Sequence, residues 1–333
     1  MSASVAQSGR QPVRFDFGGL LSRWGTIASL VLLVVFFSIK EDSAFANSRN
    51  FINILNQVSI LAILAAGLTV CLTMGLFDLS IGSIATLGGY LALRWGAEDT
   101  FGMGPYGVLL VVLLAAIVIG VANGVIVSYL GVSAFIATLA TASILDGIAL
   151  GYSDTATVQV GIPFQILDLG QAKFGPIPAP VVIMLVVMTV LWFFLERTQM
   201  GRHMYAIGGN PVAARLAGVR IKYYAILALA VSAVCAVLGG TVADAIIGAG
   251  RPYGVGSVYL LDAFAAAFIG AATLRPGRFH MLGTLVGVLL LGVINNGLSI
   301  MGAETFWQFI VKGAILILAV FLSGTVSMRR QGA

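Results

Sequence analysis

The sequence predicts an all-α polytopic membrane protein with about ten transmembrane helices. Hydrophobic residues make up 59% of the 333 residues and charged residues only 9%, and the mean hydropathy is +1.03. A soluble domain needs far more charge on its surface than this. Apolar runs of roughly 20 residues recur along the chain, which is the length of a helix that crosses the hydrocarbon core. A β-barrel is excluded because its strands show short alternating segments instead.

Each apolar run is interpreted as one span. The ten spans are Leu20–Ile39, Phe51–Met74, Leu79–Trp95, Tyr106–Leu130, Val132–Tyr152, Ala179–Leu195, Tyr223–Ala249, Val258–Leu274, Met281–Met301 and Phe306–Ser323. The third and eighth spans are short, so re-entrant segments and a total of eight spans remain the alternative. The predicted organisation is a tail (1–19), a membrane domain (20–323) that includes a polar loop (196–222), and a second tail (324–333).

Basic residues predict the orientation, because cytoplasmic loops retain Lys and Arg. With the N-terminus inside, the inside segments hold Arg10, Arg14, Arg23, Arg197, Arg202, Arg215, Arg220, Lys222, Arg275, Arg278, Arg329 and Arg330. The outside segments hold only Lys40, Arg49, Arg94, Lys173 and Arg251. Both termini and the 196–222 loop are therefore expected in the cytoplasm. This distribution explains the pI of 9.4 without a nucleic-acid partner.

The first span could also be a cleaved signal peptide, since "AFA" (44–46) follows a basic and then apolar stretch. The polar "KED" before this sequence and the charge balance favour an uncleaved anchor. Cys71 and Cys235 both fall inside spans, so neither a disulfide framework nor a metal site is expected from them.

Two parts of the chain resemble each other weakly. "DLSIGSIATLGG" from Asp78 matches "DAFAAAFIGAAT" from Asp262, and "IGVANGV" (119–125) matches "LGVINNGL" (291–298). The third to fifth spans thus pair with the eighth to tenth, and an offset of five spans places the two sets in opposite orientations. Inverted repeats of this kind are typical of transporters. A chance match between apolar segments is the alternative.

Polar residues inside the spans are the candidates for a translocation path or for polar packing. They are Asn56, Asp78, Asn123, Asp146, Asp244, Asp262, Asn295 and Asn296. Ionisable groups at membrane depth are costly, so they face a bundle interior or a wet cavity.

Several of these residues have a second interpretation. Asp78 and Asp262 would act as helix N-caps of the third and eighth spans. Asn123 lies in a GxxxG packing pattern (120–124), and a second such pattern occurs at 283–287. Asp146 and Asp244 lie too deep in their spans to be caps, and Lys312 is a candidate counter-charge for one of them.

The sequence lacks the motifs of the common enzyme classes. It has no G-x-x-x-x-G-K-[ST] motif and no Gly-Lys dipeptide, so no P-loop for ATP is expected. His203 and His280 lie apart from any Cys or carboxylate cluster, which argues against a metal centre. The sequence offers no candidate catalytic triad either. The chain is therefore expected to form a transport pathway and not to be an enzyme, with no catalytic residues and no cofactor of its own.

The stretch "AIGGNPVAARLAGVRIK" (206–222) predicts a short helix over residues 211–217. Gly208-Gly209 is expected to be a flexible break, Asn210 an N-cap, Pro211 the first helical residue and Gly218 a left-handed stop. Two turns are marginal alone in water, so the helix must dock on another surface. Ala213, Ala214 and Ala217 form its small face and Arg215 adds a charge. The partner is either another protein or this chain's own helix ends.

From about residue 45 to 323 the sequence resembles the permease subunits of bacterial ABC importers for ribose, xylose, galactose and related sugars. The resemblance is carried by "DLSIGS" (78–83), "FIATLAT" (135–141), "GRHMYAIGGNPVAARLAGV" (201–219), "LLDAFAAAFIGAATL" (260–274), "GTLVGVLLLGVINNGL" (283–298) and "FWQFIVKGAILILAV" (306–320). Two positions depart from the pattern. Val212 stands where an acidic residue is common, and "LRPGRFHMLG" (274–283) replaces a glycine-rich loop.

The resemblance implies a division of labour. Residues 210–218 would form the coupling helix that fits an ATPase subunit, and that subunit would bind ATP and magnesium. A periplasmic binding protein would deliver a sugar or polyol, and two permease chains, identical or different, would form the path in the bacterial inner membrane. An ion-coupled secondary transporter that uses Asp146, Asp244 and Lys312, and a permease for branched-chain amino acids, are the alternatives.

Overall fold

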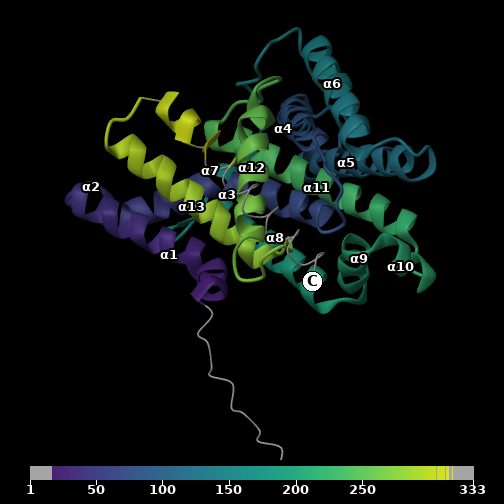
Figure 1. Ribbon diagram of the computed structural model, residues 1–333. Helices are drawn as coiled ribbons and strands as arrows, with labels where there is room; N and C mark the ends of the chain where they lie inside the picture. The colour runs from purple at the N-terminus through teal and green to yellow at the C-terminus, as the bar shows by residue number, and fades with distance from the viewer. Residues whose placement is uncertain (1–16, 305, 312, 315–316, 318–333) are drawn as a thin grey trace, which may run out of the picture.

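The structure is a computed structural model that describes residues 17–304, 306–311, 313–314 and 317. These residues form a bundle of helices, together with one antiparallel hairpin of two-residue strands (Figure 1). The predicted all-α class is therefore confirmed for this part of the chain. Most residues of the two predicted tails lie outside the described residues, and α1 begins at Phe17, three residues before the predicted first span.

The elements follow one another without large insertions. They are α1 (Phe17–Lys40), α2 (Asp42–Phe45), α3 (Ser48–Leu72), α4 (Ser80–Glu98), α5 (Gly104–Tyr129), α6 (Ala134–Ser153), α7 (Phe164–Gln171), β1 (Lys173–Phe174), β2 (Ile177–Pro178), α8 (Ala179–Arg197), α9 (Gln199–Gly209), α10 (Pro211–Leu216), α11 (Ile221–Ile247), α12 (Val255–Ala271) and α13 (Met281–Ile300).

Each of the first nine predicted spans coincides with a helix. Of the tenth span, residues 306–311 are helical, and most of the remainder lies outside the described residues. Helices α3, α5, α6, α8, α11 and α13 are long and apolar enough to cross a membrane. Trp24–Lys40 and Val255–Ala271 are shorter apolar helices. The chain is thus a multi-pass membrane protein.

Helices α3 and α11 form the centre of the bundle. They lie antiparallel, because Gly67 packs on Cys235 while Leu64 packs beside Gly239. Helix α11 also packs against α4 and α5, and α3 also packs against α12 and α13. Most of α3 is buried, whereas most of α6 is exposed and few residues of α5 are buried. The apolar outer surfaces of α5 and α6 are available to lipid or to another chain.

Helix α4 is surrounded by the protein itself over most of its length. Every residue from Ser80 to Tyr90 is buried. Gly88 contacts Val237, and the backbone of Ala85 lies against Gly240. These contacts leave no room for larger side chains, and they align the start of α4 with the middle of α11.

Helices α4 and α12 both begin inside the protein. Gly256, the second residue of α12, lies directly against the backbone of Gly82, the third residue of α4. The Gly256 N–H donates to Thr86 Oγ1 at 2.9 Å. The third and eighth predicted spans are therefore helices that start inside the protein, with their N-terminal ends in contact.

Both predicted GxxxG patterns pack helices closely. On α5, Gly120 lies against the backbone of Ala230 and Gly124 against Ile226, both on α11. On α13, Gly283 lies against Gly270 and Gly287 against the Ala266 backbone, both of which belong to α12. The packing role of these glycines is confirmed.

Candidate functional site

The short helix α10 has the predicted caps. Asn210 Oδ1 accepts from the Ala213 N–H at 3.0 Å, and Pro211 is the first helical residue. Gly218 adopts φ +81°, its N–H donates to the Arg215 carbonyl, and the Val219 N–H donates to the Ala214 carbonyl at 3.0 Å. This pair of bonds is a Schellman motif, which satisfies the last carbonyls of the helix. The helix ends at Leu216, one residue before its predicted end.

The predicted docking face of α10 is wrong in one residue. The Ala214 side chain is buried against its own chain, so it is not available to a partner. The exposed surface instead includes Val212 and Leu216, whose side chains are 67% and 86% exposed. Ala213, Ala217 and Arg215 are also exposed. One face of α10 therefore packs on this protein, and the opposite face remains uncovered.

The segment before α10 is a helix and not a flexible break. Helix α9 extends through Gly208-Gly209, and the Thr198 side chain caps its start by accepting from the Gly201 N–H. Gly208 lies against the carbonyl of Thr73, where a side chain would collide with the backbone. The glycine is thus required for close packing between α9 and the end of α3, which fixes the position of α10.

A buried chain of hydrogen bonds joins the start of α4 to α5 and α6. Ser80 Oγ donates to Asp78 Oδ1 at 2.5 Å, and the Ser80 N–H donates to the same oxygen. Asn123 Nδ2 donates to Ser80 Oγ at 3.0 Å, and Thr141 Oγ1 donates to Asn123 Oδ1 at 2.5 Å. Asp78 therefore bonds to the first residue of α4, but the N-cap residue is Leu79 and not Asp78 as predicted. Asn123 combines packing with a polar link.

A cleft of about 380 Å³ opens where α4 and α12 begin, beside α6. Its lining includes Ser83, Thr86, Ser143, Asp146, Tyr253 and Ser257. The sequence analysis singled out Asp146 but none of the hydroxyl residues of this lining. Ser80, Ser83 and Thr86 are spaced three residues apart, so they follow one face of α4, and Ser143 and Asp146 repeat this spacing on α6. That spacing is the signal that could have revealed them.

Asp146 is the only charged residue of the cleft lining. The residue is exposed, and its side chain has no hydrogen bond or ion pair within the described residues. Lys312, the candidate counter-charge for either Asp146 or Asp244, lies outside the described residues. The carboxylate is thus free to accept hydrogen bonds from a molecule in the cleft.

Asp244 is paired with an arginine of the loop that follows its own helix. Its Oδ1 lies 2.9 Å from Arg251 Nε, and its Oδ2 accepts from the Arg251 N–H at 3.2 Å. Asp244 is fully buried, so this pair holds the loop between α11 and α12 in place. Asp244 lines none of the cleft.

The remaining predicted residues are scattered and do not form one site. Asp262 lies well inside α12, so its predicted role as an N-cap is wrong. Asn296 exchanges two hydrogen bonds with Asn50, at 2.9 and 3.0 Å, and so joins α13 to α3. Asn56 and Asn295 are partly buried, and the side-chain oxygen of each is buried without a partner among the described residues.

Comparison with known proteins gives consistent matches over nearly the whole chain. The chain is 33% identical to the ribose import permease protein RbsC of Bacillus subtilis (strain 168), over 93% of this chain and 95% of the relative. It is 32% identical to the D-allose transport system permease protein AlsC of Escherichia coli (strain K12), over 94% and 95%. It is 30% identical to the xylose transport system permease protein XylH of the same strain, over 96% of both chains.

No solved structure matches the chain. One protein family matches residues 50–320, a range that contains the cleft, the buried hydrogen-bond chain and α10. This chain accordingly belongs to the family described as "branched-chain amino acid transport system / permease component".

Proposed function

We propose that this chain is the transmembrane permease subunit of an ATP-binding cassette importer, and that it forms the path for a sugar or polyol. The relatives named for ribose, allose and xylose transport support this class of substrate. A permease acts by changing shape and not by covalent chemistry.

The hydroxyl-lined cleft is the observation that carries the proposal. A sugar presents many hydroxyl groups, each of which can donate and accept a hydrogen bond. Serine and threonine hydroxyls with one carboxylate match such a ligand, because Asp146 accepts while the hydroxyls do either. The N-terminal ends of two helices meet at this cleft, which is where broken helices place the substrate in transporters.

A second permease chain would complete the path. Asp146 lies on an exposed side of α6, and an ionised carboxylate facing lipid is costly. A second copy or a related chain against α6 and the cleft would keep this group away from lipid, with water and substrate between the two subunits.

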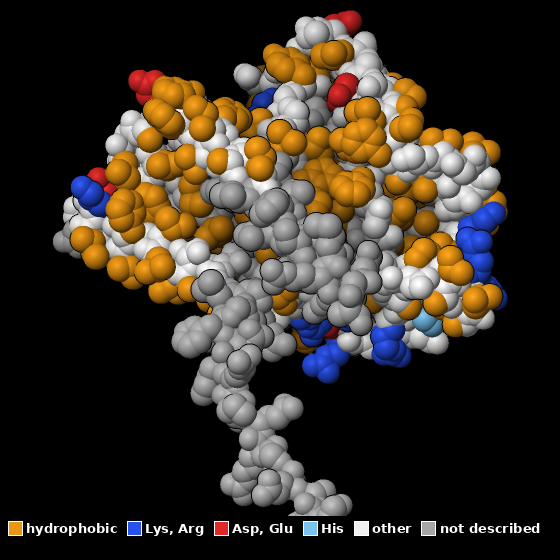
Figure 2. Space-filling model, in the orientation of Figure 1, with side chains coloured by type: hydrophobic (Ala, Val, Ile, Leu, Met, Phe, Trp, Pro, Cys, Tyr) orange, Lys and Arg blue, Asp and Glu red, His pale blue; other side chains and the backbone are white. Residues whose placement is uncertain are grey.

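The charge distribution supports an orientation with α9 and α10 in the cytoplasm. In Figure 2 basic side chains gather at the end that carries α9 and α10, and acidic side chains lie at the opposite end. Cytoplasmic segments retain Lys and Arg. With this orientation in the bacterial inner membrane both termini are cytoplasmic, and a periplasmic binding protein docks at the acidic end.

The exposed face of α10 is then the coupling surface for a separate ATPase subunit. Val212 and Leu216 would enter an apolar groove, and Arg215 would orient the contact. Because Val212 has no charge, this contact forms without a salt bridge at that position. ATP and magnesium would bind to the ATPase, and its closure would be passed through α10 and α9 to the spans.

The family description favours branched-chain amino acids as a second candidate substrate. An amino acid zwitterion needs both an anionic and a cationic partner. The cleft lining contains Asp146 and no Lys or Arg, so it suits a neutral polyhydroxy ligand better. Ion coupling through Asp244 is also disfavoured, because Arg251 already neutralises that carboxylate.

Uptake by the reconstituted complex tests the proposal. Proteoliposomes with the permease, its ATPase and its binding protein should accumulate a radiolabelled pentose or hexose only with ATP inside. The Asp146→Asn variant should lose roughly tenfold in uptake rate, the equivalent of one charged hydrogen bond. Asp154→Asn, at the end of α6 and outside the cleft, is the matched control and should be normal. Uptake driven by a proton gradient without the ATPase would reject the proposal.

A further inference from the structure

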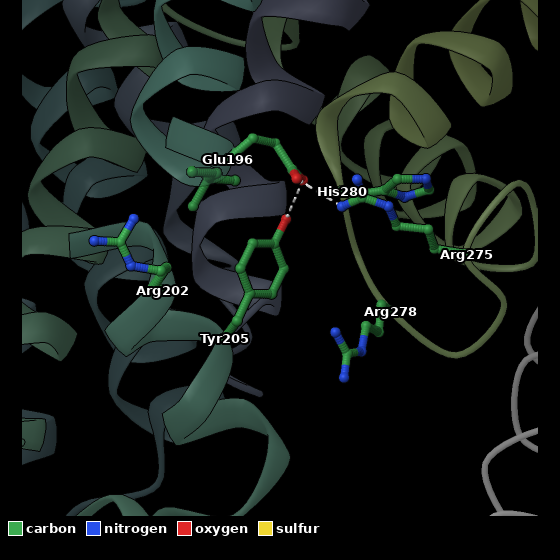
Figure 3. A pocket seen from close by; sticks show the side chains of 7 residues that line it. Glu196, Arg202, Tyr205, Arg275, Arg278 and His280 are labelled. Atoms are coloured by element: carbon green, nitrogen blue, oxygen red, sulfur yellow. Dashed lines mark hydrogen bonds and ion pairs between the residues drawn. The ribbon is translucent and has the colours of Figure 1, made fainter. Parts of the chain in front are cut away.

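A cavity of about 240 Å³ lies between α9 and the loop that joins α12 to α13 (Figure 3). A single carboxylate bridges its two sides. Glu196, the second-last residue of α8, accepts from the Tyr205 hydroxyl of α9 at 3.0 Å through Oε1, and from Arg275 Nη1 of the loop at 2.6 Å through Oε2. Arg275 belongs to the segment that departs from the sugar-permease pattern, and the proposed transport function assigns no role to any of these side chains.

This bridge uses both oxygens of the carboxylate. The Glu196 side chain is 15% exposed and the Arg275 side chain is 56% exposed, so the acidic member of the pair is the better shielded one. Burial, followed by the negative charge of Glu196, raises the pKa of the Tyr205 hydroxyl against smaller opposing effects of two arginines, so this group stays protonated and donates. No other ion pair within the described residues joins α8 or α9 to the α12–α13 loop.

On one side, the bridge is attached firmly to α10. Gly201 of α9 lies against the backbone of Leu195, where a side chain would collide, so α9 packs tightly on the end of α8. The Asn210 N–H donates to the Ala206 carbonyl at 3.0 Å while the Asn210 side chain caps α10, so α9 leads directly into α10. A displacement of α10 is therefore passed to α9 and to the end of α8, where Glu196 lies.

On the other side, the bridge is attached to α12. The Gly277 N–H donates to the Ala271 carbonyl at 2.9 Å, and the Arg278 N–H donates to the Arg275 carbonyl at 3.1 Å. These bonds close the loop onto the last residue of α12. The helix has 17 residues, so it spans about 25 Å, and Ser257 in its first turn lines the hydroxyl-lined cleft. One stiff helix thus connects Arg275 to the cleft.

We propose that Glu196 and Arg275 are positioning residues that couple the ATPase contact at α10 to the cleft through α12. This inference rests on the proposed function. Coupling between distant sites is carried by hydrogen-bond networks and rigid elements, and this ion pair joins two such elements across the cavity. Neither residue touches sugar or ATP. Because coupling is reciprocal, a sugar-loaded binding protein at the outer end should also act on the ATPase through the same pair.

The reconstituted complex tests this role. In proteoliposomes with the permease, its ATPase and its binding protein, two quantities are measured: the sugar taken up per ATP hydrolysed, and the stimulation of ATP hydrolysis by sugar-loaded binding protein. The variants are Glu196→Gln, Arg275→Gln and Arg275→Lys, of which the last keeps the charge. Arg278→Gln is the matched control. Arg278 is an exposed arginine of the same loop that lies away from the Glu196 carboxylate (Figure 3), and its side chain has no ion pair within the described residues.

Glu196→Gln and Arg275→Gln should assemble with the ATPase and keep its basal hydrolysis rate, but uptake per ATP and stimulation should each fall about fivefold or more. Arg275→Lys should stay close to the wild type, and Arg278→Gln should equal it. The inference is overturned if assembled Arg275→Gln keeps the wild-type ratio, if Arg278→Gln loses as much, or if Arg275→Gln fails to assemble, which would assign the pair a structural role. A wild-type complex without ATP-dependent uptake would instead reject the proposed function, and this inference with it.

Discussion

Asp244 is a buried carboxylate whose charge is balanced within its own chain. The Asp244 side chain is fully buried, whereas the Arg251 side chain is 33% exposed. The two partners therefore respond differently to loss of the pair. Arg251 can turn toward solvent, but Asp244 would stay buried as an uncompensated charge, which is the costly case.

Arg251→Gln should consequently destabilise the protein more than Asp244→Asn. We expect a loss of about 3 kcal/mol in the free energy of unfolding for Arg251→Gln, since a buried charge loses its partner. For Asp244→Asn we expect about 1 kcal/mol, because the remaining arginine reaches water. Unfolding midpoints in detergent measure both. Wild-type midpoints for both variants would show that the pair does not hold the α11–α12 loop.

At the scale of single elements, α10 packs on this protein with one face and leaves the other free. Ala214 is buried within the chain, while Leu216 projects outward. Substitutions on the two faces of the same helix should therefore separate folding from partner binding. A charged side chain at position 214 would be buried without a partner, which costs several kcal/mol.

Leu216→Glu should abolish ATPase association while the permease accumulates normally in the membrane. Ala214→Glu should instead lower the amount or the thermal stability of the permease itself, and it would lose the ATPase only as a consequence. Co-purification with the ATPase, normalised to the permease recovered, distinguishes the two variants. Normal association of Leu216→Glu would remove the exposed face of α10 from the coupling surface.

The contact between α4 and α12 gives a second test at this scale. A methyl group on Gly256 would collide with the backbone of Gly82, so Gly256→Ala should cost about 1–3 kcal/mol of stability. Gly147→Ala on α6 is the matched control, because no atom lies within 4 Å of the added carbon. There the better helix propensity of alanine predicts a neutral or slightly stabilising effect. Wild-type stability of Gly256→Ala would mean that the two helix starts do not touch.

The sequence predicted helices and their caps better than it predicted which residues contact each other in the folded protein. The caps of α10 depend on residues next to the helix, so Asn210, Pro211 and Gly218 were sufficient to place it. The Asn50–Asn296 pair joins residues 246 positions apart, and the sequence predicted only one of its members. Ala214 illustrates the same limit, because a helix pattern does not reveal which face its own protein covers. Contacts between distant residues depend on how the helices pack, and the hydrophobic pattern of a single helix carries no information about that packing.

At the scale of the whole molecule, the helix contacts follow the symmetry of the proposed inverted repeat. Helix α11 packs against α4 and α5, and α3 packs in the same way against α12 and α13. The central helices α3 and α11 pack on each other in antiparallel orientation, and α4 and α12 meet at their first turns. The two halves of the chain thus make equivalent contacts, which supports the pairing of the third and fourth spans with the eighth and ninth. The cleft lies where the two sets meet, as expected for a transport path.

The orientation of the whole molecule can be tested with single cysteines. Cys71 and Cys235 are buried, so the wild-type chain should give little background with a membrane-impermeant thiol reagent. Gln199 begins α9 at the basic end, and Asp168 lies on α7, on the other side of the α8 span; both are exposed. In intact cells with a permeabilised outer membrane, Asp168→Cys should react and Gln199→Cys should not. Inside-out vesicles should reverse this result, because basic segments remain in the cytoplasm. If both cysteines react from the same side, α8 does not cross the membrane and the proposed position of α10 beside an ATPase is wrong.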